Sequence, residues 1–314
     1  SMGEHLWHLN DRLKAQEEYD KASKIGDDMD MVQNNLGITF IRKEDYPNAI
    51  RACNKAIDIN PRFADAYNNL GIAYYNTNRY PEAQGAYLKA IEYIPKDTYY
   101  YNLAALYRSW GKTTEAVEAY KNALSVNPYV VRSHYLLANS FLDENKLDEA
   151  LSEYQRTLEL EPDNYEAYAQ MGVAWFKKDM YDNAIEAYNK CLAINPNVAE
   201  AYHGLGSCYF KKGDMKKAIE YYKKAISIRP TLFEAYNSLS LTLTGLNRWA
   251  EAAEYLKKAV ELKTNDADLY NRLGIACAMS GSNKEAFSAW ETALKIDPNY
   301  KNAELNIQKF KKDL

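Results

Sequence analysis

A pattern of small and bulky residues recurs about every 34 residues along this chain of 314 residues, and such a period limits the fold more than any single motif does. In one copy the pattern runs Tyr67, Leu70, Gly71 and Tyr74. When the register is set on the proline that closes most copies, eight repeats begin at Asp30, Ala64, Asp97, Val131, Tyr165, Ala199, Phe233 and Ala267. A repeat of this size cannot bury its own apolar face, so the repeats must stack into a solenoid.

Each repeat contains two segments with helical spacing. Apolar or small residues at the fourth, seventh, eighth and eleventh places share one face of an α-helix, because they lie three or four positions apart. The second segment carries an alanine in every repeat, at Ala49, Ala83, Ala116, Ala150, Ala184, Ala218, Ala252 and Ala286. The fifteenth place between the segments is mostly glycine or asparagine, which tolerate the left-handed backbone that ends a helix. We therefore expect a pair of helices in each repeat.

These positions resemble the tetratricopeptide repeat (TPR) family over about residues 30–298. The resemblance implies an all-α fold, a right-handed superhelical solenoid of antiparallel helix pairs with about eight TPR units and a capping helix at each end. It also implies that the first helices line the concave side. The seventh repeat departs most from the pattern, with Ser240 where most other repeats have glycine or alanine.

The ends of the chain predict four segments. Residues 1–3 are typical of an expression remnant, which leaves open a signal, an anchor or a further domain in the natural protein. Residues 4–29 carry alanine and tyrosine at the spacing of a second helix, so we expect the N-terminal helix of a truncated repeat. Residues 30–298 form the eight repeats, and 299–314 carry an apolar stripe at helical spacing that predicts a C-terminal capping helix.

Composition narrows the classes of partner. The chain has 39 Lys and Arg against 43 Asp and Glu, a net charge of −4, which argues against nucleic acid as the main ligand. No apolar stretch is long enough for a membrane span, and no secretory signal is visible. These absences favour a cytoplasmic location.

Signals for catalysis, cofactors and metals are poor. The four cysteines fit no zinc spacing and are expected to be small buried hydrophobes. His5 and His8 lie about one helical turn apart, but a solvent-facing pair is the favoured interpretation over a metal site. We therefore expect no catalytic residue, no cofactor and no metal, and classify the chain as a non-enzyme.

The remaining candidate site is the concave groove. If the fourth, seventh, eighth and eleventh places face the core, then the second, fifth, ninth and twelfth face the groove, with the sixth on its flank. Asparagine amides suit the backbone of an extended peptide, and tyrosines add apolar area at little entropic cost. The predicted peptide-binding residues are Asn34, Asn35, Asn68, Asn69, Tyr75, Tyr101, Asn102, Arg108, Tyr135 and Asn139. The alternative is that the asparagines are merely solvated polar residues.

The sequence therefore predicts a protein-interaction scaffold that binds a peptide or helix of a partner protein. Two alternatives stay open: the substrate-recruiting TPR arm of a larger enzyme, and a self-assembling scaffold. Lysines gather late in the chain, including Lys177, Lys178, Lys211 and Lys212. They fit either an acidic partner or, as the favoured interpretation, a solvated helix face.

Overall fold

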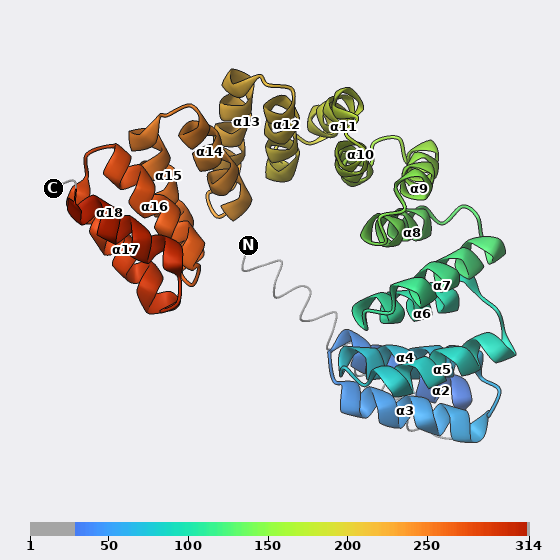
Figure 1. Ribbon diagram of the computed structural model, residues 1–314. Helices are drawn as coiled ribbons and strands as arrows, with labels where there is room; N and C mark the ends of the chain where they lie inside the picture. The colour runs from blue at the N-terminus through green and yellow to red at the C-terminus, as the bar shows by residue number, and fades with distance from the viewer. Residues whose placement is uncertain (1–28, 313–314) are drawn as a thin grey trace, which may run out of the picture. The chain divides into compact units, whose positions relative to one another are not determined.

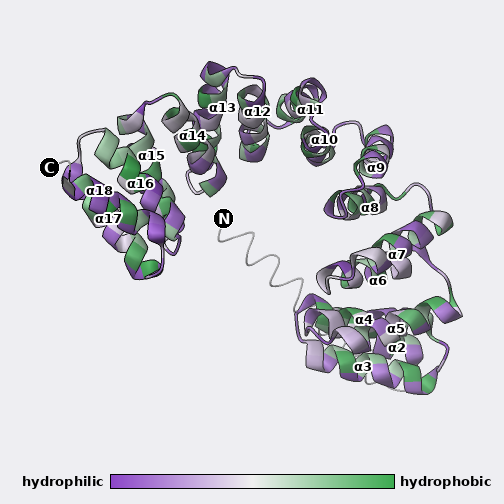
Figure 2. Cartoon of the chain, viewed as in Figure 1, coloured by the Kyte–Doolittle hydropathy of each residue, from purple (hydrophilic) through white to green (hydrophobic). Residues whose placement is uncertain are grey.

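The computed structural model describes residues 29–312, which form seventeen α-helices and no strand (Figure 1). The prediction of an all-α fold built from consecutive helix pairs is confirmed. Figure 2 shows hydrophobic and hydrophilic residues mixed along the helices, as expected for helices with one buried and one exposed face. The expected helix over residues 4–29, with His5 and His8, lies outside the described residues.

The chain divides into two compact halves, one ending at Leu160 and one beginning at Glu161. The N-terminal half contains α2 (Asp30–Arg42), α3 (Tyr46–Ile59), α4 (Ala64–Asn76), α5 (Tyr80–Tyr93), α6 (Asp97–Ser109), α7 (Thr113–Val126), α8 (Val131–Asp143) and α9 (Leu147–Leu160). The C-terminal half contains α10 (Tyr165–Lys177), α11 (Tyr181–Ile194), α12 (Ala199–Lys211), α13 (Met215–Ile228), α14 (Phe233–Gly245), α15 (Trp249–Leu262), α16 (Ala267–Met279), α17 (Asn283–Ile296) and α18 (Lys301–Lys312).

One left-handed residue separates the two helices of every repeat. The backbone φ is positive at Glu44, Asn78, Gly111, Asn145, Asp179, Gly213, Asn247 and Gly281. Glycine and asparagine adopt this conformation readily, whereas it is costly for the glutamate at position 44, where φ is 60°. The turn geometry is therefore the same in all eight repeats, whichever residue occupies it.

Small residues of one helix pack against large residues of the next helix. The recurring alanines of the second helices, such as Ala83 and Ala116, are fully buried. A Cβ added at Gly71 in α4 would lie 2.6 Å from ring atoms of Tyr87 in α5. Such close approach explains why glycine is kept inside a helix, where it costs about 1 kcal/mol relative to alanine.

The seventh repeat compensates for its departure from the pattern. The Arg272 guanidinium in α16 donates to Ser240 Oγ at 3.1 Å and to Asn237 Oδ1 at 2.7 Å, both in α14. Burial lowers the pKa of Arg272. The side chain of Arg272 thus ties this repeat to the eighth.

The last described helix, α18, packs against α16 and α17. Ala303 is fully buried, and the Phe310 ring lies edge-on to Trp290 with 5.6 Å between centroids. Within residues 29–312, no helix has the length and apolar character needed to cross a bilayer.

Candidate functional site

The ten predicted site residues lie on α2, α4, α6 and α8, the first helices of the four repeats in the N-terminal half. Contacts of α2 with α4 and of α4 with α6 place these three helices side by side. We call the surface made by their second, fifth, sixth, ninth and twelfth places the first-helix face. It corresponds to the side on which the sequence predicts a groove.

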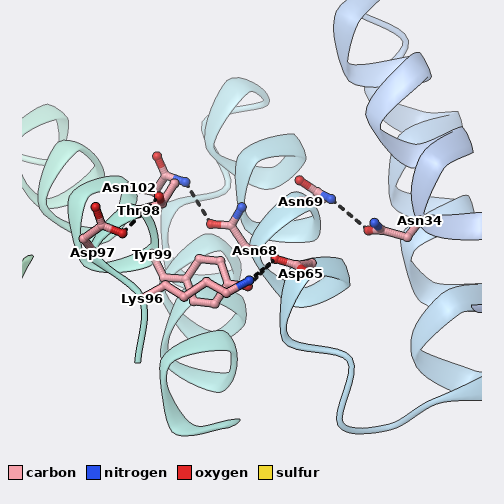
Figure 3. A network of polar contacts seen from close by, with 9 residues as sticks. All are labelled: Asn34, Asp65, Asn68, Asn69, Lys96, Asp97, Thr98, Tyr99 and Asn102. Carbon is pink, nitrogen blue, oxygen red and sulfur yellow. Dashed lines mark hydrogen bonds and ion pairs between the residues drawn. The ribbon is translucent and has the colours of Figure 1, made fainter. Parts of the chain in front are cut away.

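Four of the predicted asparagines bond to one another (Figure 3). Asn69 Nδ2 donates to Asn34 Oδ1, and Asn102 Nδ2 donates to Asn68 Oδ1, both at 2.8 Å. Asn34, Asn68 and Asn69 are only 6 to 8% exposed. Because a buried amide needs hydrogen-bond partners, these pairs hold neighbouring first helices together. One hydrogen-bonding group of each of these amides is therefore already in use within the protein.

The same connection recurs in the C-terminal half. His203 Nε2 lies 3.0 Å from Ser238 Oγ, Arg272 donates to Asn237, and Asn306 Nδ2 donates to Asn271 Oδ1 at 2.8 Å. Each pair joins the fifth place of one first helix to the sixth place of the next first helix or, for Asn306, to the sixth residue of the capping helix α18. We call these contacts polar rungs. Sequence reasoning missed them, although polar residues 34 or 35 positions apart were the available signal.

A second cross-repeat network starts at Asp65 in α4 (Figure 3). Lys96 Nζ lies 3.0 Å from Asp65 Oδ1, and the Tyr99 hydroxyl donates to the same oxygen. Burial opposes ionisation of Asp65, but the hydrogen bonds from Tyr99 and Lys96 outweigh it and lower its pKa. The Asp65 carboxylate therefore holds the N-terminal end of α6 against α4.

The predicted tyrosines are held in defined positions. The Tyr75 hydroxyl lies 2.8 Å from Ser109 Oγ, and the Tyr101 hydroxyl accepts from Arg132 Nε at 2.7 Å. The Tyr101 ring meets the Tyr120 ring edge-on, with centroids 6.1 Å apart. These contacts restrain two half-buried aromatic side chains on the first-helix face before any ligand arrives.

Tyr135 and Asn139 of α8 meet a tyrosine of α9. The Tyr135 ring lies 6.1 Å from the Tyr154 ring, and the Tyr154 hydroxyl donates to Asn139 Oδ1 at 2.6 Å. Tyr120 occupies the matching place in α7, but its buried hydroxyl has no hydrogen-bond partner among residues 29–312. The residue that would face it is Ala105, which offers no polar side chain.

Asn35 and Arg108 differ from the other predicted residues because both are exposed. Within the described part of the chain, neither side chain makes a hydrogen bond or an ion pair. A ligand can therefore bind their amide and guanidinium groups without breaking a side-chain hydrogen bond or ion pair to any of residues 29–312.

In residues 29–312, no cluster of three histidine, cysteine or acidic side chains has the geometry of a metal site. All four cysteines are buried, and burial raises the pKa of Cys53 and Cys208 to about 12. These two thiols stay protonated near neutral pH and are poor nucleophiles.

Family models match most of the chain. The model described as Cilia and flagella-associated protein 70 C-terminal domain matches residues 129–310, more than half of the sequence. Models described as TPR repeat or tetratricopeptide repeat match residues 37–78, 64–97 and 98–129. No curated protein sequence matches the chain.

Several solved structures are similar. A tetratricopeptide repeat protein from Parabacteroides merdae is 18% identical, with 77% of this chain and 96% of that chain covered and a TM-score of 0.60. A chain of the APC/C hetero-tetramer Cut9–Hcn1 is 18% identical, with 95% of this chain and 58% of that chain covered and a TM-score of 0.56. MamA is 33% identical, with coverages of 52% and 95% and a TM-score of 0.48. The first two likenesses bear on the fold alone.

Proposed function

We propose that this chain is a non-enzymatic scaffold. It belongs to the tetratricopeptide-repeat family and, within it, to the family of the Cilia and flagella-associated protein 70 C-terminal domain. It binds an extended or helical segment of a partner protein on the first-helix face of its N-terminal half. Proteins built from such repeats generally serve as interaction scaffolds. We take residues 30–298 as the eight repeats and 299–314 as a capping helix.

The restrained tyrosines of the first-helix face are the observation that supports this function best. Tyr75, Tyr101 and Tyr135 come from three successive first helices, and each is half-buried. Rigid aromatic side chains lose little entropy on binding, so they suit the role of contact residues. The restraints on Tyr75 and Tyr101 by Ser109 and Arg132 therefore favour a prepared binding surface.

Among the predicted polar contacts, we assign the main ligand role to Asn35 and Arg108. Both are exposed and make no internal side-chain bond within residues 29–312. The asparagines of the polar rungs, such as Asn69, have less to offer because their amides already tie the helices together. A ligand backbone can still use the donors and acceptors that remain.

The test is affinity capture from a lysate of the cells that naturally express the chain. The wild type is compared with the double variant Asn35→Ala/Arg108→Ala, and with Asn54→Ala/Arg62→Ala as the matched control. Asn54 and Arg62 are exposed residues of the same types, on α3 and in the turn after it. We expect a partner that the wild type and the control retain and the first variant loses. Equal retention by all three proteins would place the binding site elsewhere.

A further inference from the structure

The C-terminal half contains a cavity of about 180 Å³ at the first helices α12 and α14. Phe176, Phe210 and Leu241 supply apolar walls, with contributions from Ser207 and Tyr222. Phe210 is 38% and Leu241 47% exposed, so the mouth of the cavity presents large apolar side chains to solvent. An apolar cavity of about 150 Å³ is large enough to bind benzene, which makes this one large enough for a phenyl ring.

The hydroxyl groups of the cavity are all engaged within the protein. Ser207 Oγ donates to His203 O at 3.0 Å, and the Tyr222 hydroxyl donates to Ser207 Oγ at 3.3 Å. Thr242 Oγ1 donates to Ser238 O at 2.8 Å, and Ser238 Oγ pairs with His203 Nε2. An apolar guest therefore enters without leaving any of these hydroxyls unpaired, which would otherwise cost binding energy.

A lysine stands beside this apolar space. Lys211, the last residue of α12, lines the cavity and is exposed. Its ammonium group makes no ion pair with any residue that the structure describes. A carboxylate on a bound segment would complement this charge at the rim of an interface, where opposite charges favour association and orientation.

We infer that this cavity receives the phenylalanine side chain of a partner protein segment in which an acidic residue lies next to that phenylalanine. The phenyl ring fills the space between Phe210 and Leu241, and the carboxylate pairs with Lys211. This inference rests on the proposed function as an interaction scaffold and adds an anchor site in the C-terminal half. The site uses none of the residues on which the test of the proposed function depends.

The experiment uses the full chain and a short synthetic peptide with a single ring-fluorinated phenylalanine between glutamates, followed by fluorine NMR titration. Replacing the phenylalanine by alanine in a competing peptide should weaken binding about tenfold or more. The protein variant Leu241→Asp should weaken binding of the fluorinated peptide about tenfold. Leu246→Asp is the matched control because Leu246, the residue directly after α14, is 42% exposed but does not line the cavity.

The role of the charge is tested separately with Lys211→Glu, which should weaken binding of the peptide about fivefold. The control is Lys216→Glu, which makes the same change of charge at an exposed lysine of α13. Circular dichroism checks that each variant keeps its helices, and Phe210→Ser replaces Leu241→Asp if that variant unfolds. Equal binding of the phenylalanine and alanine peptides would overturn the inference, as would equal effects of the cavity and control variants. A dimer that Leu241→Asp dissociates, with no peptide binding, would show that a second copy is the occupant and would also overturn it.

Failure here is distinguishable from failure of the proposed function. Suppose that the cavity variants bind the peptide as tightly as the wild type does, while Asn35→Ala/Arg108→Ala still loses the captured partner. The scaffold function then stands and the anchor site is refuted. If the cavity binds the peptide but capture of no partner depends on Asn35 and Arg108, the proposed binding of a partner to the first-helix face of the N-terminal half is refuted instead.

Discussion

Replacing Gly71 by alanine tests the close helix packing that the repeat pattern imposes. The new Cβ would lie 2.6 Å from Cδ1 and Cε1 of Tyr87, well inside ordinary van der Waals contact. Tyr87 is only 2% exposed, so its ring has little room to retreat. Gly85 is the matched control, because it lies in the neighbouring helix α5 and nothing comes within 4 Å of an added Cβ.

The two substitutions share one effect and differ in another. Alanine stabilises either helix by about 1 kcal/mol relative to glycine. Overpacking at Gly71 costs about 1–3 kcal/mol, so the free energy of unfolding should be about 1–3 kcal/mol lower for Gly71→Ala than for Gly85→Ala. We expect Gly85→Ala to raise the midpoint of urea unfolding above the wild type, and Gly71→Ala to leave it unchanged or lower it. Far-UV circular dichroism follows both transitions.

A double-mutant cycle identifies the cause. In a Tyr87→Leu background the ring atoms are gone, so Gly71→Ala should become stabilising, and the two changes should be clearly non-additive. The packing argument fails if Gly71→Ala stabilises the wild-type protein as much as Gly85→Ala does.

Four further substitutions test single side chains, three of them by the same unfolding assay and His134→Phe by the pH dependence of the melting temperature. Tyr120→Phe should raise the free energy of unfolding by up to about 1 kcal/mol, because it removes a buried hydroxyl that has no partner in the described residues. Tyr154→Phe should lower the free energy of unfolding by about 1 kcal/mol, because it breaks a hydrogen bond to Asn139. Effects of the same sign and size for the two variants would refute this reasoning. Glu44→Gly should raise the free energy of unfolding by about 1 kcal/mol by relieving the φ of 60°, and no gain would show that the turn carries no strain. The hydrogen bond to Glu153 raises the pKa of His134 above 6.5, so the stability from this contact is full below pH 6.5 and is lost as pH rises through the raised pKa. His134→Phe should abolish that fall in melting temperature, and an unchanged pH profile would contradict the assignment.

Much of the fold follows from the sequence because the repeat states the same information eight times. The small place occupied by Gly71 and the large place of Tyr87 predict which helices pack together. The fifteenth place predicts a helix end even at Glu44, where the residue itself is a poor choice for a left-handed turn. Periodicity can outweigh the preference of one residue, since seven other repeats define that position.

The candidate site was less accessible to sequence reasoning. Helical spacing places Asn34 and Asn69 near the first-helix face, but it cannot show that their amides meet across two helices. That contact depends on the distance and rotation between neighbouring repeats, which a spacing rule does not contain. The cavity beside Phe210 is likewise lined by large and small side chains from several helices, so no single motif signals it.

The scaffold account depends most directly on where a partner touches the chain. A benzophenone side chain placed at position 98, an exposed place of the first-helix face on α6, or at position 62 in the turn after α3, can be cross-linked by light to a captured partner. We expect a cross-linked partner peptide from position 98, identified by mass spectrometry, and none from position 62. Cross-links from position 62 alone would contradict the proposed binding face.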